Sequence, residues 1–166
     1  MTCCYSVAAV KPIIDHAYND KTLAKMWLQS YQLGPIWVGP TIIPGAAANL
    51  YLAHLASDDP TRAALYTVSA VLIFSIMPIT LGYMEFNING ACKWKVQSLL
   101  AGEGYHMPAW NGISSAHRHS ASEKSKKWAD EWTMKQLVQR WKEWNDFRWA
   151  LTGFAVLLIG FAEYLS

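Results

Sequence analysis

The longest uncharged stretch of the chain covers residues 63–84 and reads AALYTVSAVLIFSIMPITLGYM. Charged residues stand just before it, at Asp58, Asp59 and Arg62. At about 1.5 Å per residue, a helix of this length crosses the roughly 30 Å hydrocarbon core of a bilayer. The pattern therefore predicts a transmembrane helix over residues 63–84.

Two further apolar stretches predict two more spans. No Asp, Glu, Lys or Arg occurs between Met26 and Ser57, and the candidate span in this stretch is 33–56. Three prolines and three glycines interrupt it, so we expect either a kinked helix or an irregular start before the span. The third span, 147–165, is predicted as the C-terminal part of one long amphipathic helix that begins near residue 121.

A polar segment at about 93–125 separates the second span from the long last helix, and its glycines and proline predict a loop. The fold class expected is therefore all-α: a single membrane-embedded domain over residues 1–166 with three spans. A short connection after Ser57 should join the first two spans as an antiparallel hairpin. The distribution of Lys and Arg favours a cytoplasmic polar loop, with the hairpin tip and the C-terminus on the other side.

Composition supports a lipid environment and excludes several classes of site. The chain is 52% hydrophobic and only 16% charged, against about 25% charged residues in soluble domains. A net charge of +2 is too small to indicate nucleic-acid binding. The three cysteines have no Cys-x-x-Cys spacing, so no disulfide framework or zinc site is predicted. His117 and His119 lie in the polar loop without nearby Cys or acidic ligands, so we predict no metal site there either.

Three short motifs stand in order at the ends of the predicted spans. They are Trp27-x-x-x-Tyr31-x-x-Gly34 before the first span, PITLGYMEFNIN over residues 78–89 at the end of the second, and Trp141-x-x-x-Asn145-x-x-Arg148 at the start of the last. Together they resemble the anthrone oxygenase-like (DUF1772) family of small integral membrane proteins, over about residues 6–161.

The resemblance implies a fold and an activity. Members of this family are typically four-helix membrane proteins. Several fungal members act in polyketide pathways, where they oxidise an anthrone to an anthraquinone with O2 and no evident cofactor. The resemblance therefore implies a monooxygenase without a cofactor, an aromatic polyketide as substrate, and molecular oxygen as co-substrate. The endoplasmic reticulum is the default membrane for a eukaryotic protein of this kind.

The N-terminus departs from the family pattern. Relatives carry a complete span before the first motif, whereas residues 5–15, YSVAAVKPIID, look like only the tail of one. We expect three spans here in place of four, with one wall of the bundle missing, so a homo-oligomer is an alternative to a monomeric bundle. A second departure is Glu85-Phe86, where relatives often have a proline-threonine pair.

Anthrone oxidation needs a base, a group that stabilises the anion, and an aromatic slot that excludes water. Trp141, Asn145 and Arg148 share one helix face at i, i+4 and i+7. On the functional interpretation, Asn145 and Arg148 hold a phenolate or carbonyl oxygen of the substrate. On the structural alternative, Arg148 anchors the helix at the interface and Asn145 ties two helices together.

Trp27 and Tyr31 have the same spacing with Gly34 on another predicted helix. They could stack on a flat substrate ring, with a hydrogen bond from Tyr31, or they could belong to an aromatic belt at the membrane interface.

Two ionisable residues near the apolar runs are candidates for the base. His54 has a near-neutral intrinsic pKa, although its place near the hairpin tip also fits a structural role. Glu85 follows the second span and would become a plausible base if buried; a solvated helix end is the alternative. Asn87 and Asn89 flank Glu85 and could both be turn residues; Asn87 is also a candidate substrate contact.

Two functions remain open. The first is a cofactor-independent oxygenase of an anthrone-type polycyclic phenol. The second is a non-catalytic membrane scaffold or accessory subunit of a biosynthetic complex, which the missing first span favours.

Overall fold

A computed structural model describes residues 10–109 and 116–165. It is helical throughout, with π-helical turns in η2 and a short 3₁₀ turn in η3. The elements are α2 (Lys11–His16), α3 (Asp20–Leu55), α4 (Pro60–Pro78), η2 (Ile79–Asn89), α5 (Gly90–Leu100), η3 (Ala101–Glu103), α6 (Glu123–Glu131) and α7 (Met134–Tyr164). Over these described ranges, β-structure is limited to one isolated bridge between Ala109 and His119. The all-α prediction is confirmed.

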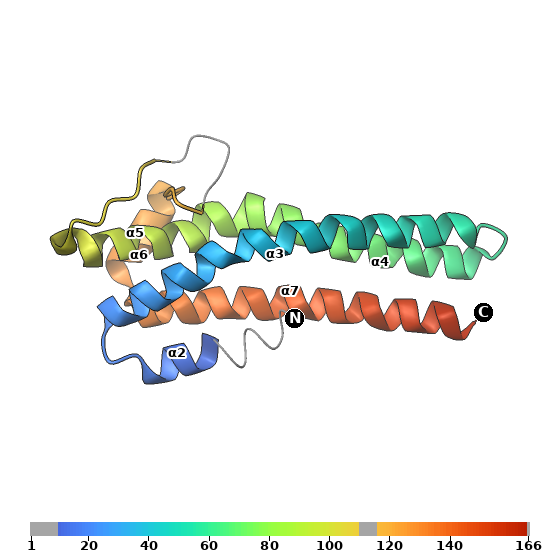
Figure 1. The fold of residues 1–166 in the computed structure, drawn as a ribbon, viewed down its shortest axis with the longest axis horizontal. Helices are drawn as coiled ribbons and strands as arrows, with labels where there is room; N and C mark the ends of the chain where they lie inside the picture. The colour runs from blue at the N-terminus through green and yellow to red at the C-terminus, as the bar shows by residue number, and fades with distance from the viewer. Residues whose placement is uncertain (1–9, 110–115, 166) are drawn as a thin grey trace.

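Long helical rods run side by side along the molecule (Figure 1). Each is long and apolar enough to cross a membrane, over Asp20–Leu55, Pro60–Glu103 and Met134–Tyr164. In their most apolar windows only 19%, 22% and 17% of residues are buried by protein, so most side chains there are left to face lipid. The chain is therefore an integral membrane protein.

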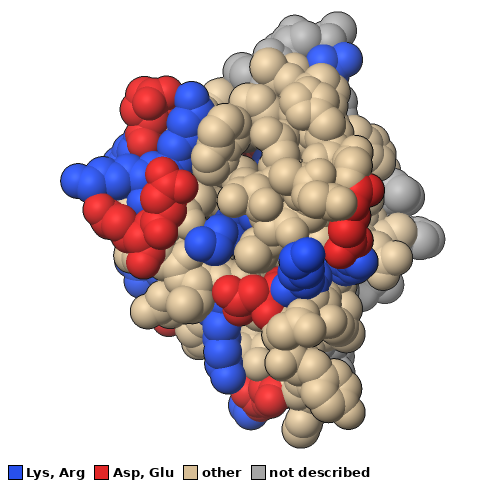
Figure 2. Space-filling view, turned by 90° about the vertical axis from the view of Figure 1, so that its left-hand side faces the viewer, with Lys and Arg blue, Asp and Glu red and all other residues tan. Residues whose placement is uncertain are grey.

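The ends of the molecule differ in character. The α3–α4 hairpin tip and the C-terminus lie at one end, and α5 and α6 lie at the other (Figure 1). This matches the arrangement expected from the sequence, although the side of the membrane on which each end lies stays a prediction. Figure 2 looks onto the α5–α6 end, where acidic and basic side chains stand next to one another. Lys25, for example, contacts Glu103 at 2.6 Å.

Helix α3 passes through its three prolines without a break. It begins at Asp20, after Asn19, whose side chain accepts a hydrogen bond from the Thr22 N–H at 2.9 Å. The predicted span 33–56 is thus only the C-terminal part of this helix. As a result, Trp27 and Tyr31 stand on the same rigid helix as the span.

The polar loop predicted at about 93–125 starts too early, because residues 90–100 form α5. Ala91, Cys92, Val96 and Leu100 point into the core and are at most 4% exposed. Their spacing makes one apolar helix face. The glycines and the proline that predict a loop all follow residue 100, whereas the residues before them continue the helix with one buried face.

The single helix predicted from about residue 121 to the C-terminus is wrong, because it is broken between α6 and α7. Thr133 starts α7 with a capping box: its Oγ1 accepts from the Gln136 N–H at 3.2 Å, and Gln136 Oε1 accepts from the Thr133 N–H at 2.9 Å. The Asp20 carboxylate also accepts from the Met134 N–H at 3.3 Å, which ties the start of α7 to the start of α3.

Thr133→Ala is expected to lower the free energy of unfolding by about 1 kcal/mol, because it removes the cap of α7. Thermal unfolding in detergent, followed by circular dichroism, measures the change. Thr67→Ala is the matched control, since the Thr67 hydroxyl bonds only within its own helix, to the Ala63 carbonyl at 2.8 Å. Equal shifts for both variants would contradict a capping role.

The main hydrophobic core lies near the α5–α6 end of the bundle. It joins residues from every element at that end, including Leu23, Trp27, Met84, Ile88, Val96, Met134, Leu137 and Trp141. The long apolar helices thus extend from a densely packed base at the α5–α6 end. The candidate site lies where these helices join that base.

Candidate functional site

A buried ion pair links Glu85 of η2 to Lys93 of α5, with side chains 4% and 0% exposed. The π-helical stretch that carries Glu85 starts directly after Pro78, which has no N–H for the regular helical ladder. Short π-helical insertions are frequent at functional sites. Glu85, Asn89 and Lys93 follow at four-residue spacing, and all three side chains are buried together.

The Glu85 carboxylate accepts from four donors. Oε2 accepts from the Tyr31 hydroxyl at 2.7 Å and from Asn89 Nδ2 at 3.1 Å. Oε1 accepts from Lys93 Nζ and from the Ser120 hydroxyl in two very short contacts. A carboxylate has about four lone-pair sites, so this donor set matches an ionised Glu85.

Lys93 is held by groups from three parts of the chain. Besides Glu85, its ammonium donates to the Arg118 backbone carbonyl at 3.0 Å and to the Tyr31 hydroxyl at 3.3 Å. It also stands 5.0 Å from the centre of the Tyr31 ring. Burial of a charge without such partners would cost several kcal/mol, so these contacts explain how Lys93 can be fully buried.

The segment before α6, residues 116–122, closes the aqueous side of this pair. Ser120 is 7% exposed, and its hydroxyl lies 2.8 Å from the Glu85 backbone carbonyl as well as against the carboxylate. Gly90 permits the close approach, since a Cβ there would stand 3.0 Å from Ala121 Cα and 3.1 Å from Ser125 Oγ. Any larger residue at position 90 would push this segment away from Glu85.

His119 lies next to Ser120 and packs edge-on against Trp94, with ring centres 5.1 Å apart. Partial burial lowers the pKa of His119, and the charges of Lys126 and Lys93 lower it further. The imidazole therefore stays neutral near pH 7 and adds no positive charge beside Lys93.

The cluster sits where the apolar rod meets the packed base. Glu85 is the first charged residue after the uncharged run 63–84. Tyr31 comes from α3 and Lys93 from α5, on the base side of that run. The cluster therefore joins the end of the apolar rod to the packed base.

The two aromatic residues predicted to stack on a substrate instead stack on each other. The Trp27 and Tyr31 rings are 5.1 Å apart at 16°, and Trp141 packs edge-on against Trp27 at 6.0 Å. Both Trp27 and Tyr31 are buried, at 1% and 8% exposure. They form the wall behind the ion pair and leave no slot between themselves.

Helices α3 and α7 run parallel and in register at this level. Asp20 contacts Met134, and Trp27 contacts Trp141, so both pairs are 114 residues apart in sequence. Continued along both helices, the same register predicts Tyr31 at the level of Asn145 and Gly34 at the level of Arg148. The two i, i+4, i+7 stripes seen in the sequence thus meet at Trp27 and Trp141.

Arg148 is 8% exposed although it lies one turn further toward the lipid. Its Nη1 donates to Asn145 Oδ1 at 3.0 Å, and Asn145 Nδ2 donates to the Trp141 carbonyl at 2.9 Å. Among the described residues, Arg148 Nε has no hydrogen-bond partner. A Cβ added at Gly34, on the same level, would meet no heavy atom of the described residues within 4 Å. Arg148 therefore keeps a donor for an acceptor that enters at this level.

Two predicted site residues lie elsewhere. His54 is exposed in the last turn of α3, about 35 Å along the helix from Tyr31 at ~1.5 Å per residue. It cannot share a site with Glu85. Asn87 is turned away from the cluster and donates back to the Tyr83 carbonyl at 2.8 Å. Asn89, on the opposite side of the turn, is the asparagine that reaches Glu85.

The alternative that Glu85 is a solvated helix end is wrong, because its side chain is 4% exposed. Sequence reasoning placed Asn89 beside Glu85 but chose Asn87 as the site residue, and it missed the partners Lys93 and Ser120. The four-residue spacing of Glu85, Asn89 and Lys93 was a usable signal, but it requires that the helix continue beyond the apolar run. The contact of Ser120 with Glu85 depends on packing between segments that are distant in sequence. The local spacing of residues therefore gives no signal for it.

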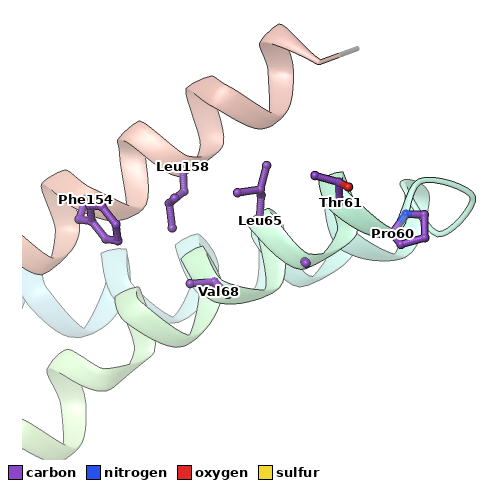
Figure 3. Close-up of a pocket in the computed structure, with 7 residues that line it drawn as sticks. Pro60, Thr61, Leu65, Val68, Phe154 and Leu158 are labelled. Atoms are coloured by element: carbon purple, nitrogen blue, oxygen red, sulfur yellow. The ribbon is translucent and has the colours of Figure 1, made fainter.

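One apolar hollow of the described structure lies away from this cluster. It has a volume of about 630 Å³ and lies between α4 and α7 near the hairpin end, lined by Pro60, Thr61, Ala64, Leu65, Val68, Phe154 and Leu158 (Figure 3). Val68 is on the order of 20 Å from Glu85 along the rod. The lining is apolar and lacks ionisable side chains, so this groove suits a lipid chain better than a reaction.

No group of three His, Cys, Asp or Glu that could hold a metal ion occurs in residues 10–109 and 116–165. His117 bonds instead to the Gln32 side chain, at 2.9 Å from Nδ1 to Nε2.

Comparisons with known proteins give one assignment. No curated protein and no solved structure matches the chain. The family described as Anthrone oxygenase matches residues 27–158. That range begins at Trp27 and contains the ion pair, the aromatic wall and Arg148. Since the match covers well over half of the sequence, the chain belongs to the anthrone oxygenase family.

Proposed function

We propose that this protein is a cofactor-independent oxygenase that oxidises an anthrone-type polycyclic phenol to the quinone. The ring CH2 of the anthrone becomes a carbonyl: anthrone plus O2 gives quinone plus water. The observation that carries the proposal is the buried Glu85–Lys93–Tyr31 cluster at the membrane boundary, in a member of this family.

The reaction requires little from the protein beyond acid–base catalysis. Removal of one proton from the CH2 group leaves an electron-rich enolate, which can reduce O2 itself. The resulting hydroperoxide loses water to form the carbonyl. We propose O2 as the sole co-substrate for this reason, with Glu85 as the base that accepts the proton.

The positive groups around the cluster support a role in stabilising the enolate. Lys93 lies beside Tyr31 and Glu85, and Arg148 holds a donor at the level of Gly34. We propose that the substrate lies between α3 and α7 at this level. Its oxygen would face Arg148 and Asn145, and its CH2 group would face the Tyr31–Glu85 side. Fixed donors aimed at a developing oxyanion act strongly where water is excluded.

A membrane location suits a flat apolar substrate, because such a molecule concentrates in lipid and can enter between helices. We propose a place in polyketide secondary metabolism, in the membrane of the endoplasmic reticulum, on the strength of the family alone.

One observation favours a second function, a non-catalytic scaffold. The four donors on Glu85 tie together α3, η2, α5 and the segment before α6. A network of this kind can have a purely structural role, in which it holds the base of the bundle together. The activity test below separates the two functions.

The decisive experiment supplies emodin anthrone and O2 to the purified protein in detergent or nanodiscs and follows quinone absorbance above the spontaneous rate. Arg148→Ala is expected to lower the rate roughly 10²-fold, as for loss of one oxyanion donor. Arg148→Lys should fall between Ala and wild type, because it keeps the charge without the planar guanidinium.

Arg140→Ala is the matched control, since Arg140 is an exposed arginine of the same helix that pairs with Glu143 at 2.9 Å. It should oxidise the anthrone at the wild-type rate. If wild type and Arg148→Ala both stay at the spontaneous rate, the oxygenase function is wrong and the scaffold stands.

A further inference from the structure

Ser120 stands against Glu85 in a way that the ion pair alone does not require. Its Oγ contacts Glu85 Oε1 and lies 2.8 Å from the backbone carbonyl oxygen of the same residue. A hydroxyl has a single hydrogen, so Ser120 can donate fully to only one of these two acceptors at a time.

The two donation states suit two protonation states of Glu85. When Ser120 donates to Oε1, the carboxylate is ionised and has its four donors. When the hydroxyl turns toward the backbone carbonyl, one lone pair on Oε1 becomes available for a proton. The neutral carboxyl can then donate that proton to Ser120 Oγ, which still has lone pairs.

We propose that Ser120 is a positioning residue that lets Glu85 gain and lose a proton without leaving its place. The inference rests on the function proposed above, in which Glu85 is the base. In each cycle Glu85 takes one proton from the substrate, the neutral carboxyl donates from Oε1 to Ser120 Oγ, and the Ser120 hydrogen moves from the carboxylate to the Glu85 carbonyl. Loss of the proton to water reverses both changes, so atoms and charge balance.

The neighbouring residues hold the carboxylate in place while the Ser120 hydroxyl rotates. Tyr31 and Asn89 hold Oε2, and Lys93 stays against Oε1 in either state. Ser120 itself is 7% exposed and is the group of residues 116–122 that reaches the carboxylate. A preorganised partner for both protonation states reduces the reorganisation that accompanies proton transfer.

The test compares Ser120→Ala with Ser120→Thr in the anthrone assay. Ser120→Ala is expected to lower kcat about tenfold, as for loss of one hydrogen bond to a charged group, with KM near the wild-type value. The solvent deuterium isotope effect on kcat should rise in this variant, because the transfer of the proton from Glu85 to water becomes slower relative to the other steps. Ser120→Thr should restore both parameters, since it keeps the hydroxyl.

Ser75→Ala is the control, because the Ser75 hydroxyl bonds only to the Leu72 carbonyl within α4, at 2.7 Å. Thermal unfolding of each variant reports whether the fold persists. If Ser120→Ala keeps the wild-type kcat and isotope effect, the inference about Ser120 is wrong and the proposed function stands. Equal loss in Ser120→Ala and Ser120→Thr, with a matching loss of stability, would also overturn it. A wild-type protein at the spontaneous rate removes the proposed function itself, and with it this role of Ser120.

Discussion

Lys93→Met is expected to lower the free energy of unfolding by about 3–5 kcal/mol, because it leaves the Glu85 charge buried without its partner. Lys93 and Glu85 side chains are 0% and 4% exposed, so water cannot replace the lost ammonium. Thermal or denaturant unfolding in a mild detergent, followed by near-ultraviolet circular dichroism, measures the loss. Methionine preserves most of the length of lysine, which limits the packing change.

The double variant Glu85→Gln/Lys93→Met should regain most of the lost stability, since neutral isosteres of a buried ion pair are often neutral or stabilising. Lys11→Met is the surface control. Its pair with Asp15 is at 2.6 Å, but the side chains are 63% and 42% exposed, so the loss of stability should be much smaller than in Lys93→Met. A Lys93→Met protein as stable as wild type would mean that Glu85 is already neutral.

Glu85→Gln is expected to lower kcat for anthrone oxidation by roughly 10²–10⁴-fold, the range that positioned acid–base groups contribute. Glutamine retains an acceptor for Tyr31 and Lys93 but cannot take a proton. The measurement is initial quinone formation at saturating anthrone, corrected for the spontaneous rate. Because this variant leaves Lys93 without its counter-charge, its folded fraction has to be measured in the same sample.

The double variant Glu85→Gln/Lys93→Met removes the unpaired charge: it should fold well and still fail to oxidise the anthrone, and Lys93→Met alone measures the part of the loss that comes from the ammonium. Glu163→Gln is the carboxylate control, since Glu163 accepts from Tyr66 at 2.5 Å near the other end of the bundle. It should keep the wild-type rate. Full activity in Glu85→Gln would show that another group is the base.

The lipid environment is readable from the sequence because it depends on hydrophobic length alone. The run 63–84 needs no knowledge of neighbouring helices to be recognised as a span, and it lies within the rod Pro60–Glu103. The start of α3 at Asn19–Asp20 is equally local, since it rests on one side chain and the N–H groups that follow.

Errors in the prediction arose where a local pattern had two interpretations. The loop prediction rests on glycines and a proline that follow residue 100, and it wrongly includes the residues around Lys93, which carry the apolar stripe of α5. One continuous last helix is predicted through Thr133 because the helical spacing of apolar residues continues on both sides of the break. The capping box Thr133-x-x-Gln136 was the local signal that would have placed it.

The sequence by itself determined the three helices within residues 10–109 and 116–165 that are able to cross a membrane. It also determined that Trp27 and Tyr31 share one helix face while Asn145 and Arg148 share another. Only the tertiary structure decided which of these faces meet. It separated His54 from the cluster and brought Glu85, Lys93 and Ser120 together. The reason is physical: periodicity orders side chains around one helix axis, whereas the partners of a buried charge come from other segments and are set by packing.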